Sequence, residues 1–150
     1  MRKSIVFIIL LTLLLVAVVP CYAADYDNIS AVVMVGNTGE MSYNQNPHIR
    51  LPMASTTKIM TAIIAIENLP DLDILVNVPI DACGIEGSSI YLYENEIISA
   101  EALLYGLLLD SGNDAAVALA ISVGESLDGF VSMMNSKAGE LGLENTHYMN

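Results

Sequence analysis

The sequence predicts a mixed α/β domain of the α+β type, in which a cluster of helices surrounds a buried helix beside an antiparallel sheet. A β-branched apolar segment at residues 29–35, followed by a turn and a second alternating segment, indicates a hairpin. The pattern at residues 55–68 is helical and apolar on nearly every side, which is typical of a helix in a domain interior. The hairpin has few candidate partner strands, so we expect the sheet to be incomplete in these 150 residues.

Residues 1–23 have the pattern of a secretory signal peptide. Two basic residues precede an apolar run at residues 5–19, and the small residues that end at Ala23 favour cleavage after it. A membrane anchor is the alternative, but a run of about 15 residues is shorter than the ~20 that a spanning helix needs. A lipoprotein signal is disfavoured because Pro20 precedes Cys21, where such signals carry a small residue. We therefore expect an exported protein, in the periplasm or on the outer face of the cytoplasmic membrane.

The remaining residues, 24–150, are long enough for one domain with a hydrophobic core, and they are strongly acidic. They carry 17 acidic residues against three basic ones, a net charge of −14. Such a surface repels phosphate groups, which argues against nucleic acid and anionic lipid as partners. Cys83 is the only cysteine of this part, so no internal disulfide can form, and we expect it to be a small buried apolar side chain.

The elements before the interior helix are predicted from alternation and turn residues. Residues 29–35 and 41–45 read as two strands, joined by a Gly-Asn-Thr-Gly turn at residues 36–39. Two prolines make residues 46–54 an irregular crossing segment.

The interior helix, residues 55–68, is followed by a short predicted strand at 74–78 and a turn-rich stretch at 81–89. The Tyr91-Leu92-Tyr93 segment alternates like a strand, and the serines before it are candidates for the border of a cleft. Three further helices are predicted at residues 99–109, 114–123 and 127–141, and Gly142 ends the last of them.

The start of the interior helix places a hydroxyl and an amine one helical turn apart. Ser55 and Lys58 stand at positions i and i+3, which share a helix face, so the two groups can meet. The helix dipole favours negative charge at Ser55 and, with the apolar surroundings, lowers the pKa of Lys58 toward that of a working base. A plainer interpretation is a helix cap and a solvated lysine, because Ser-x-x-Lys is expected by chance about once in a few hundred residues. Against it, Lys58 is the only basic residue between Arg50 and Lys137, in a helix with no exposed polar face.

A second polar element, Ser111-Gly112-Asn113, lies in the short connection between two predicted helices. Its serine and asparagine flank one glycine and project from a tight turn in a common direction. An ordinary turn or helix cap explains such a segment when it stands alone. Ser-x-x-Lys followed by Ser-x-Asn, however, is the ordered pair found in penicillin-binding enzymes and serine β-lactamases.

Four ordered blocks closely resemble the low-molecular-mass D-alanyl-D-alanine carboxypeptidases, which are penicillin-binding proteins of serine peptidase family S11. The likeness runs from about residue 29 to residue 150. The blocks are residues 53–62 (MASTTKIMTA), 86–92 (EGSSIYL), 103–116 (LLYGLLLDSGNDAA) and 141–147 (LGLENTH). The resemblance implies a β-lactamase/transpeptidase-like fold, with the nucleophile helix against the sheet.

The resemblance also implies a function for each polar residue of the two motifs. Ser55 would be the acylated nucleophile, Lys58 its general base, Ser111 a proton relay toward the leaving amine, and Asn113 a hydrogen-bond donor to the carbonyl side of the substrate. The implied reaction removes the terminal D-alanine from peptidoglycan stem peptides, through an acyl-enzyme that water hydrolyses. β-Lactams would acylate the same serine as covalent inhibitors, and no cofactor is implied.

The chain departs from the family at a third motif, a Lys-Thr-Gly strand that recognises the substrate carboxylate and helps to complete the oxyanion hole. The only similar triplet, Lys137-Ala138-Gly139, falls inside a helical pattern. We therefore expect a truncated chain, without the remaining strands or the C-terminal region through which many relatives associate with membranes. Because one oxyanion donor contributes roughly 10²–10³ in rate, we expect weak activity or none from the 150 residues alone.

Two other functions stay open at this point. A β-lactamase or esterase shares the first two motifs, but it needs a deacylating carboxylate near the cleft, and no glutamate stands out. A non-catalytic exported domain that keeps the fold without turnover is the other alternative. His48 and His147 lie far from the two motifs and lack a third ligand, so we expect no metal site.

Overall fold

The computed structural model describes residues 29–149, so the predicted signal peptide lies outside the described residues. The chain divides into two compact units, one that ends at Pro52 and one that begins at Met53. The assignment of residues 24–150 to one catalytic domain stays a prediction.

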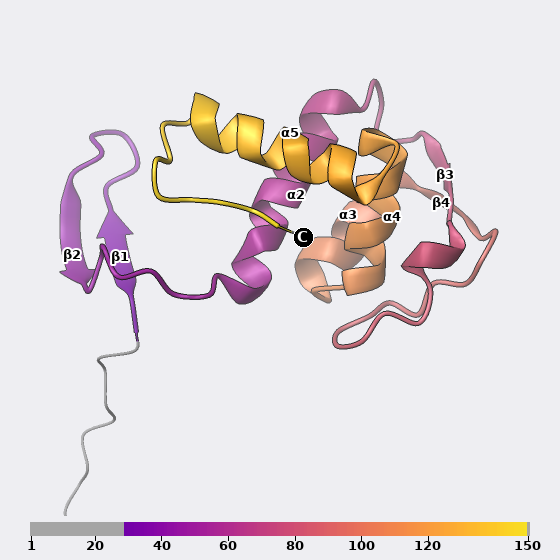
Figure 1. Cartoon of the computed structure of the whole chain (residues 1–150), viewed down its shortest axis with the longest axis horizontal. Coiled ribbons are helices and arrows are strands. Elements are labelled where there is room, and N and C mark those ends of the chain that lie inside the picture. Colours follow the sequence, from indigo (N-terminus) through magenta and orange to yellow (C-terminus); the bar gives the residue numbers. More distant parts are fainter. Residues whose placement is uncertain (1–28, 150) are drawn as a thin grey trace, which may run out of the picture. The chain divides into compact units, whose positions relative to one another are not determined.

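The first unit is a β-hairpin (Figure 1). Strand β1 (Ala31–Met34) pairs antiparallel with β2 (Met41–Gln45), and the register shifts at a bulge between Val33 and Met34. The connecting turn is closed by Val35, whose N–H donates to the Glu40 carbonyl at 2.8 Å. The predicted hairpin is therefore confirmed.

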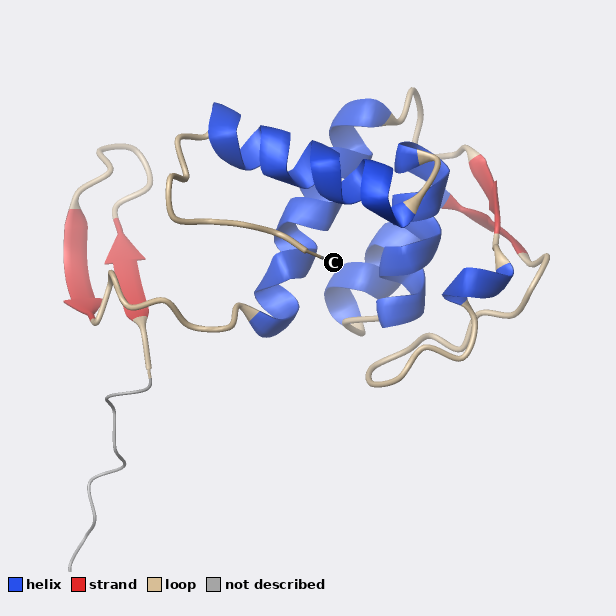
Figure 2. Ribbon diagram, viewed as in Figure 1, coloured by secondary structure: helices blue, strands red, loops and turns tan. Residues whose placement is uncertain are grey.

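The second unit is a cluster of helices with a small two-stranded sheet (Figure 2). Strand β3 (Leu75–Asn77) pairs antiparallel with β4 (Ile97–Ser99). There are also two short 3₁₀ turns: η2 (Ala54–Thr56) comes directly before the first helix of the unit, and η3 (Ile80–Ala82) lies between β3 and β4. The α-helices are α2 (Thr57–Asn68), α3 (Ala100–Leu109), α4 (Asn113–Gly124) and α5 (Leu127–Glu140).

Serine side chains begin two of these helices. Ser99 Oγ accepts a hydrogen bond from Ala102 N at the start of α3, and Ser126 Oγ accepts one from Gly129 N at the start of α5. Each bond satisfies one of the N–H groups that the first turn of a helix leaves unpaired. The helix predictions are confirmed to within a few residues at each end.

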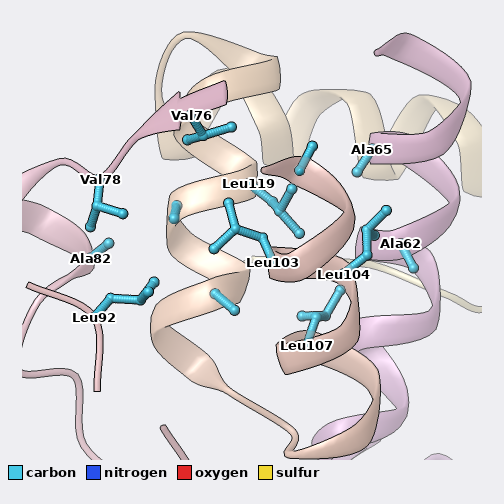
Figure 3. Packing of buried hydrophobic residues seen from close by; sticks show 13 residues of the cluster. Ala62, Ala65, Val76, Val78, Ala82, Leu92, Leu103, Leu104, Leu107 and Leu119 are labelled. Carbon is cyan, nitrogen blue, oxygen red and sulfur yellow. The ribbon is translucent and has the colours of Figure 1, made fainter. Parts of the chain in front are cut away.

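Helix α4 is central, because it contacts α2, α3 and α5 as well as β3 and η3. Two of its alanines, Ala115 and Ala118, are fully buried and allow the neighbouring helices to approach closely. Leu103, Leu107 and Leu119 fill the space between α3 and α4 (Figure 3). A second apolar cluster joins α2 to α5 through Met60, Ile64, Phe130, Met134 and neighbouring residues.

The structure differs from the sequence predictions in four details. Helix α2 buries one face rather than its whole circumference, since Ile59 and Ile66 remain 58% and 51% exposed. Strand β4 was not predicted, and the Tyr91–Leu92–Tyr93 segment does not pair as a strand. Cys83 is half-buried rather than fully buried, and its thiol is free.

Within residues 29–149, no single helix is long and apolar enough to cross a membrane. Among the described helices, only α4 and α5 taken together have the necessary length and composition, and the pair bends by 85° at the break between them.

Candidate active site

Ser55 lies in the 3₁₀ turn η2, directly before α2, rather than in the α-helix itself. The residue before it, Ala54, has φ +47°, a left-handed conformation that is rare for a residue with a side chain. Thr56 turns its hydroxyl back onto the Met53 carbonyl at 2.6 Å and does not cap the helix. The serine hydroxyl is thereby presented on an exposed corner at the N-terminal end of α2.

The connection between α3 and α4 forms a second strained corner. Ser111 has φ +57°, and Gly112 donates its N–H to the Gly106 carbonyl at 2.9 Å. A Cβ on Gly112 would lie 2.9 Å from Asp114 Oδ1 and 3.2 Å from Gly106 O, so the corner needs a glycine at this position. Strain of this kind persists where surrounding contacts determine the backbone, and it is concentrated at functional sites.

The structure brings all four sequence-predicted site residues together. Ser111 Oγ donates to Ser55 Oγ at 2.9 Å, and Lys58 Nζ donates to Asn113 Oδ1 at 2.6 Å. Two hydrogen bonds thus join the start of α2 to the start of α4. No hydrogen bond links Lys58 Nζ directly to Ser55 Oγ in the part of the chain that the structure describes.

The surroundings of Lys58 favour its neutral form. The side chain is half-buried between α2 and α4, and this burial lowers the pKa of the amine below its ordinary value. The direction agrees with the sequence prediction. A neutral amine that donates one N–H to Asn113 still has a lone pair with which to accept a proton.

The side-chain amide of Asn113 is fixed on both sides. Its Nδ2 donates to the Glu86 carbonyl at 2.7 Å, and its backbone N–H donates to the Ser88 carbonyl at 2.8 Å. Since Nδ2 faces a carbonyl, Oδ1 is the atom that faces Lys58. The loop that contains Glu86 and Ser88 therefore borders the site, as the sequence indicated for the serines before Tyr91.

Asp114 is a further residue of this region that the sequence analysis did not single out. Its carboxylate is fully buried and accepts hydrogen bonds from Ser89 Oγ at 2.6 Å and from the backbone N–H groups of Ile90, Leu92 and Ala115. Burial by itself raises the pKa of Asp114, but these four hydrogen bonds outweigh it, and the net shift is downward. The available signal was a lone carboxylate in the first turn of a helix that has no other charged residue.

Lys137-Ala138-Gly139 lies within α5, as predicted, and not on a strand. Lys137 forms ion pairs with Glu67 at 2.6 Å and with Glu140 at 2.8 Å. These partners raise the pKa of Lys137, which is the opposite of the shift at Lys58. The triplet is therefore no substitute for a Lys-Thr-Gly strand.

Comparison with known proteins identifies relatives over most of the chain. The family model of the D-alanyl-D-alanine carboxypeptidases, Peptidase S11, matches residues 18–150. The chain is similar to D-alanyl-D-alanine carboxypeptidase DacF of Bacillus subtilis, with 40% identity over an alignment of 125 residues, and the match covers 81% of this chain and 32% of the relative. The chain thus spans about a third of the length of that relative.

Solved structures show the same likeness. The crystal structure of the carboxypeptidase DacD from Francisella tularensis superposes with a TM-score of 0.78 at 35% identity, over 83% of this chain and 31% of that one. A mutant of the Streptomyces K15 DD-transpeptidase gives a TM-score of 0.73 at 32% identity, over 81% and 51% of the two chains. The helical cluster with its small antiparallel sheets is therefore part of the penicillin-binding, transpeptidase-like fold. Because the family model covers most of the sequence and the fold agrees, the chain belongs to the D-alanyl-D-alanine carboxypeptidase family, Peptidase S11.

Proposed function

We propose that the chain carries the nucleophile, the base and the proton relay of a serine-type D-Ala-D-Ala carboxypeptidase. Ser55 attacks the carbonyl between the two D-alanines of a peptidoglycan stem peptide, the terminal D-alanine leaves, and water hydrolyses the resulting ester. One observation carries the proposal: the two hydrogen bonds that join Ser111 to Ser55 and Lys58 to Asn113.

The proposed proton transfers use Lys58 and Ser111, which lie at the same corner as Ser55. Neutral Lys58 accepts the Ser55 proton as the C–O bond forms, and the pKa that burial lowers favours this neutral state. Ser111, hydrogen-bonded to Ser55, donates a proton to the departing amine and regains one from the base. Asn113 uses one Nδ2 hydrogen for the Glu86 carbonyl, which leaves its second hydrogen for the substrate.

The proposal extends to partners and location. β-Lactams present a strained amide in place of the scissile bond and are proposed to acylate Ser55. The signal-peptide pattern of residues 1–23 supports an exported protein that acts on the outer side of the cytoplasmic membrane, and the net charge of −14 on residues 24–150 argues against nucleic acid as a partner. The chain covers about a third of the curated relative, so the proposal for this chain concerns the acylation residues that it contains.

Covalent labelling with a fluorescent penicillin tests the function. The chain is incubated with excess reagent for long enough to detect acylation that is slowed about 10²–10³-fold, and the labelled residue is located by mass spectrometry. We expect a stable adduct on Ser55 that disappears in Ser55→Ala and Lys58→Ala. Lys137→Ala is the matched lysine control and should label like the unmodified chain, since its ion pairs lie on α2 and α5 away from the corner.

Three results would contradict the proposal in different ways. Rapid turnover of the penicillin indicates a β-lactamase, and absence of any adduct in a folded chain indicates a non-catalytic domain. An adduct of undiminished rate in Lys58→Ala removes the lysine as base. Circular dichroism of each variant confirms that it is folded.

A further inference from the structure

Asp114 is a fully buried carboxylate that the proposed mechanism does not use. In the described part of the chain no cation pairs with Asp114. Its charge is balanced instead by one hydroxyl and three backbone N–H groups. A buried carboxylate that is stabilised in this way holds the segments that supply the hydrogen-bond donors in place. Moving a donor away would leave the charge poorly solvated, which costs free energy.

Three of the four donors come from one loop, residues 89–92. Ile90 N–H donates to Asp114 Oδ1 at 3.1 Å, and Leu92 N–H donates to Oδ2 at 3.0 Å. Between them lies Tyr91, which has φ +62°, and its own N–H donates to Ser89 Oγ. The carboxylate therefore bridges a strained residue, and the side chain of Leu92 is part of the apolar core (Figure 3).

The same loop continues to the Asn113 amide. Ser88 O and Glu86 O accept the backbone and side-chain N–H groups of Asn113, at 2.8 Å and 2.7 Å. Gly87, between these two carbonyls, lies so near that a Cβ would come 2.8 Å from Asn113 Nδ2. The position of the loop thus decides which way the amide faces, and so whether Oδ1 meets Lys58 Nζ.

We propose that Asp114 is a positioning residue for the acylation site: its carboxylate fixes the loop at residues 86–92, and through that loop it orients the Asn113 amide toward Lys58. The effect on acylation rests on the proposed function, whereas the orientation of the amide does not. Among the described residues no hydrogen bond joins Asp114 to Ser55 or Lys58, so its effect on them passes through these intermediates.

Asp114→Asn tests the proposal with little change in shape. One carboxylate oxygen is replaced by an NH2 group, which cannot accept hydrogen bonds from the hydroxyl or the N–H groups that face it. The loop at residues 86–92 therefore loses hydrogen bonds and should become less fixed. Asp128→Asn is the matched control, because Asp128 also lies in the first turn of a helix, α5, but is exposed. We expect the side-chain amide NMR signals of Asn113 to shift in Asp114→Asn and to stay in place in Asp128→Asn. Unchanged Asn113 signals in folded Asp114→Asn overturn the proposal.

Acylation kinetics separate positioning from a general loss of stability. Displacing a catalytic group by about an ångström costs on the order of 100-fold in rate. We therefore expect the folded molecules of Asp114→Asn to be acylated about 100-fold more slowly than the unmodified chain. In an Asn113→Ala background, the same change should lower the rate by less than about twofold, because the residue through which Asp114 acts is gone. A full effect in that background overturns the proposal.

Two further outcomes keep the test decisive. If Asp114→Asn fails to fold, Ser89→Ala takes its place: it removes one of the four donors and should shift the same Asn113 signals, and unchanged signals overturn the proposal. If the unmodified chain forms no adduct, the proposed function fails, while the Asn113 signals still decide whether Asp114 orients the amide.

Discussion

A methyl group at Gly87 is expected to push the Asn113 amide away from Lys58. An alanine Cβ at this position lies 2.8 Å from Asn113 Nδ2, and the backbone has φ +92°. The conformational strain alone destabilises the folded state by about 1–3 kcal/mol. Because Asn113 is hydrogen-bonded to Glu86 on one side and to Lys58 on the other, the amide cannot swing freely, and the 2.6 Å bond from Lys58 must lengthen.

The expected loss in the acylation rate follows from that one bond. A hydrogen bond between neutral groups contributes about 0.5–1.5 kcal/mol, and about 1.4 kcal/mol corresponds to a factor of ten, so Gly87→Ala should acylate about 2–10-fold more slowly. The assay is the rate constant for fluorescent penicillin, corrected for the folded fraction from urea unfolding. Gly84→Ala is the control, since Gly84 has φ +68° in the same region but has no atom within 4 Å of the added Cβ. Both variants should lose stability, and equal corrected rates for the two would refute the reasoning.

Three further predictions concern the base, the core and a helix cap. Burial lowers the pKa of Lys58 below 10.5, so the acylation rate should rise with pH through a midpoint below that value, since only the neutral amine accepts a proton; a midpoint at or above 10.5 contradicts this role. Leu119→Ala, at a fully buried position, should lower the free energy of unfolding by about 2–5 kcal/mol, whereas Leu109→Ala, 76% exposed, should change it by less than about 0.5 kcal/mol. Ser126→Ala should cost about 1 kcal/mol in urea unfolding, because it removes the acceptor of the Gly129 N–H; unchanged stability would exclude a capping contribution.

The sequence predicted the helices and the hairpin well because both depend on periodicity and turn residues along the chain. Strand β4 (Ile97–Ser99) escaped prediction because three residues carry no usable alternation, and it exists through pairing with β3, some twenty positions away. The segment at Tyr91 shows the reverse error. Its exposure does alternate, from 87% at Tyr91 to 7% at Leu92, but its N–H groups turn to Asp114 and Ser89 instead of to a neighbouring strand.

The candidate site was predictable as a set of residues but not as a set of bonds. The ordered motifs indicated that Ser55, Lys58, Ser111 and Asn113 belong together, and the structure places them in hydrogen-bonding contact. That Lys58 binds the Asn113 oxygen depends on which way an amide faces, and this in turn depends on a loop carbonyl at residue 86. Backbone carbonyls have no sequence signature, so such contacts emerge only from tertiary structure.

The two hydrogen bonds that join the start of α2 to the start of α4 connect distant parts of the chain. The Lys58–Asn113 bond spans 55 positions in the sequence, and the Ser55–Ser111 bond spans 56. The site consequently has no local precursor: individual helices can form early while the reactive groups remain separated by an unclosed loop. A compact intermediate with native helix content but loose side-chain packing would be inert to penicillin. Covalent labelling during refolding from urea therefore reports when the tertiary structure forms. The labelling should begin only after the far-ultraviolet circular dichroism signal has recovered.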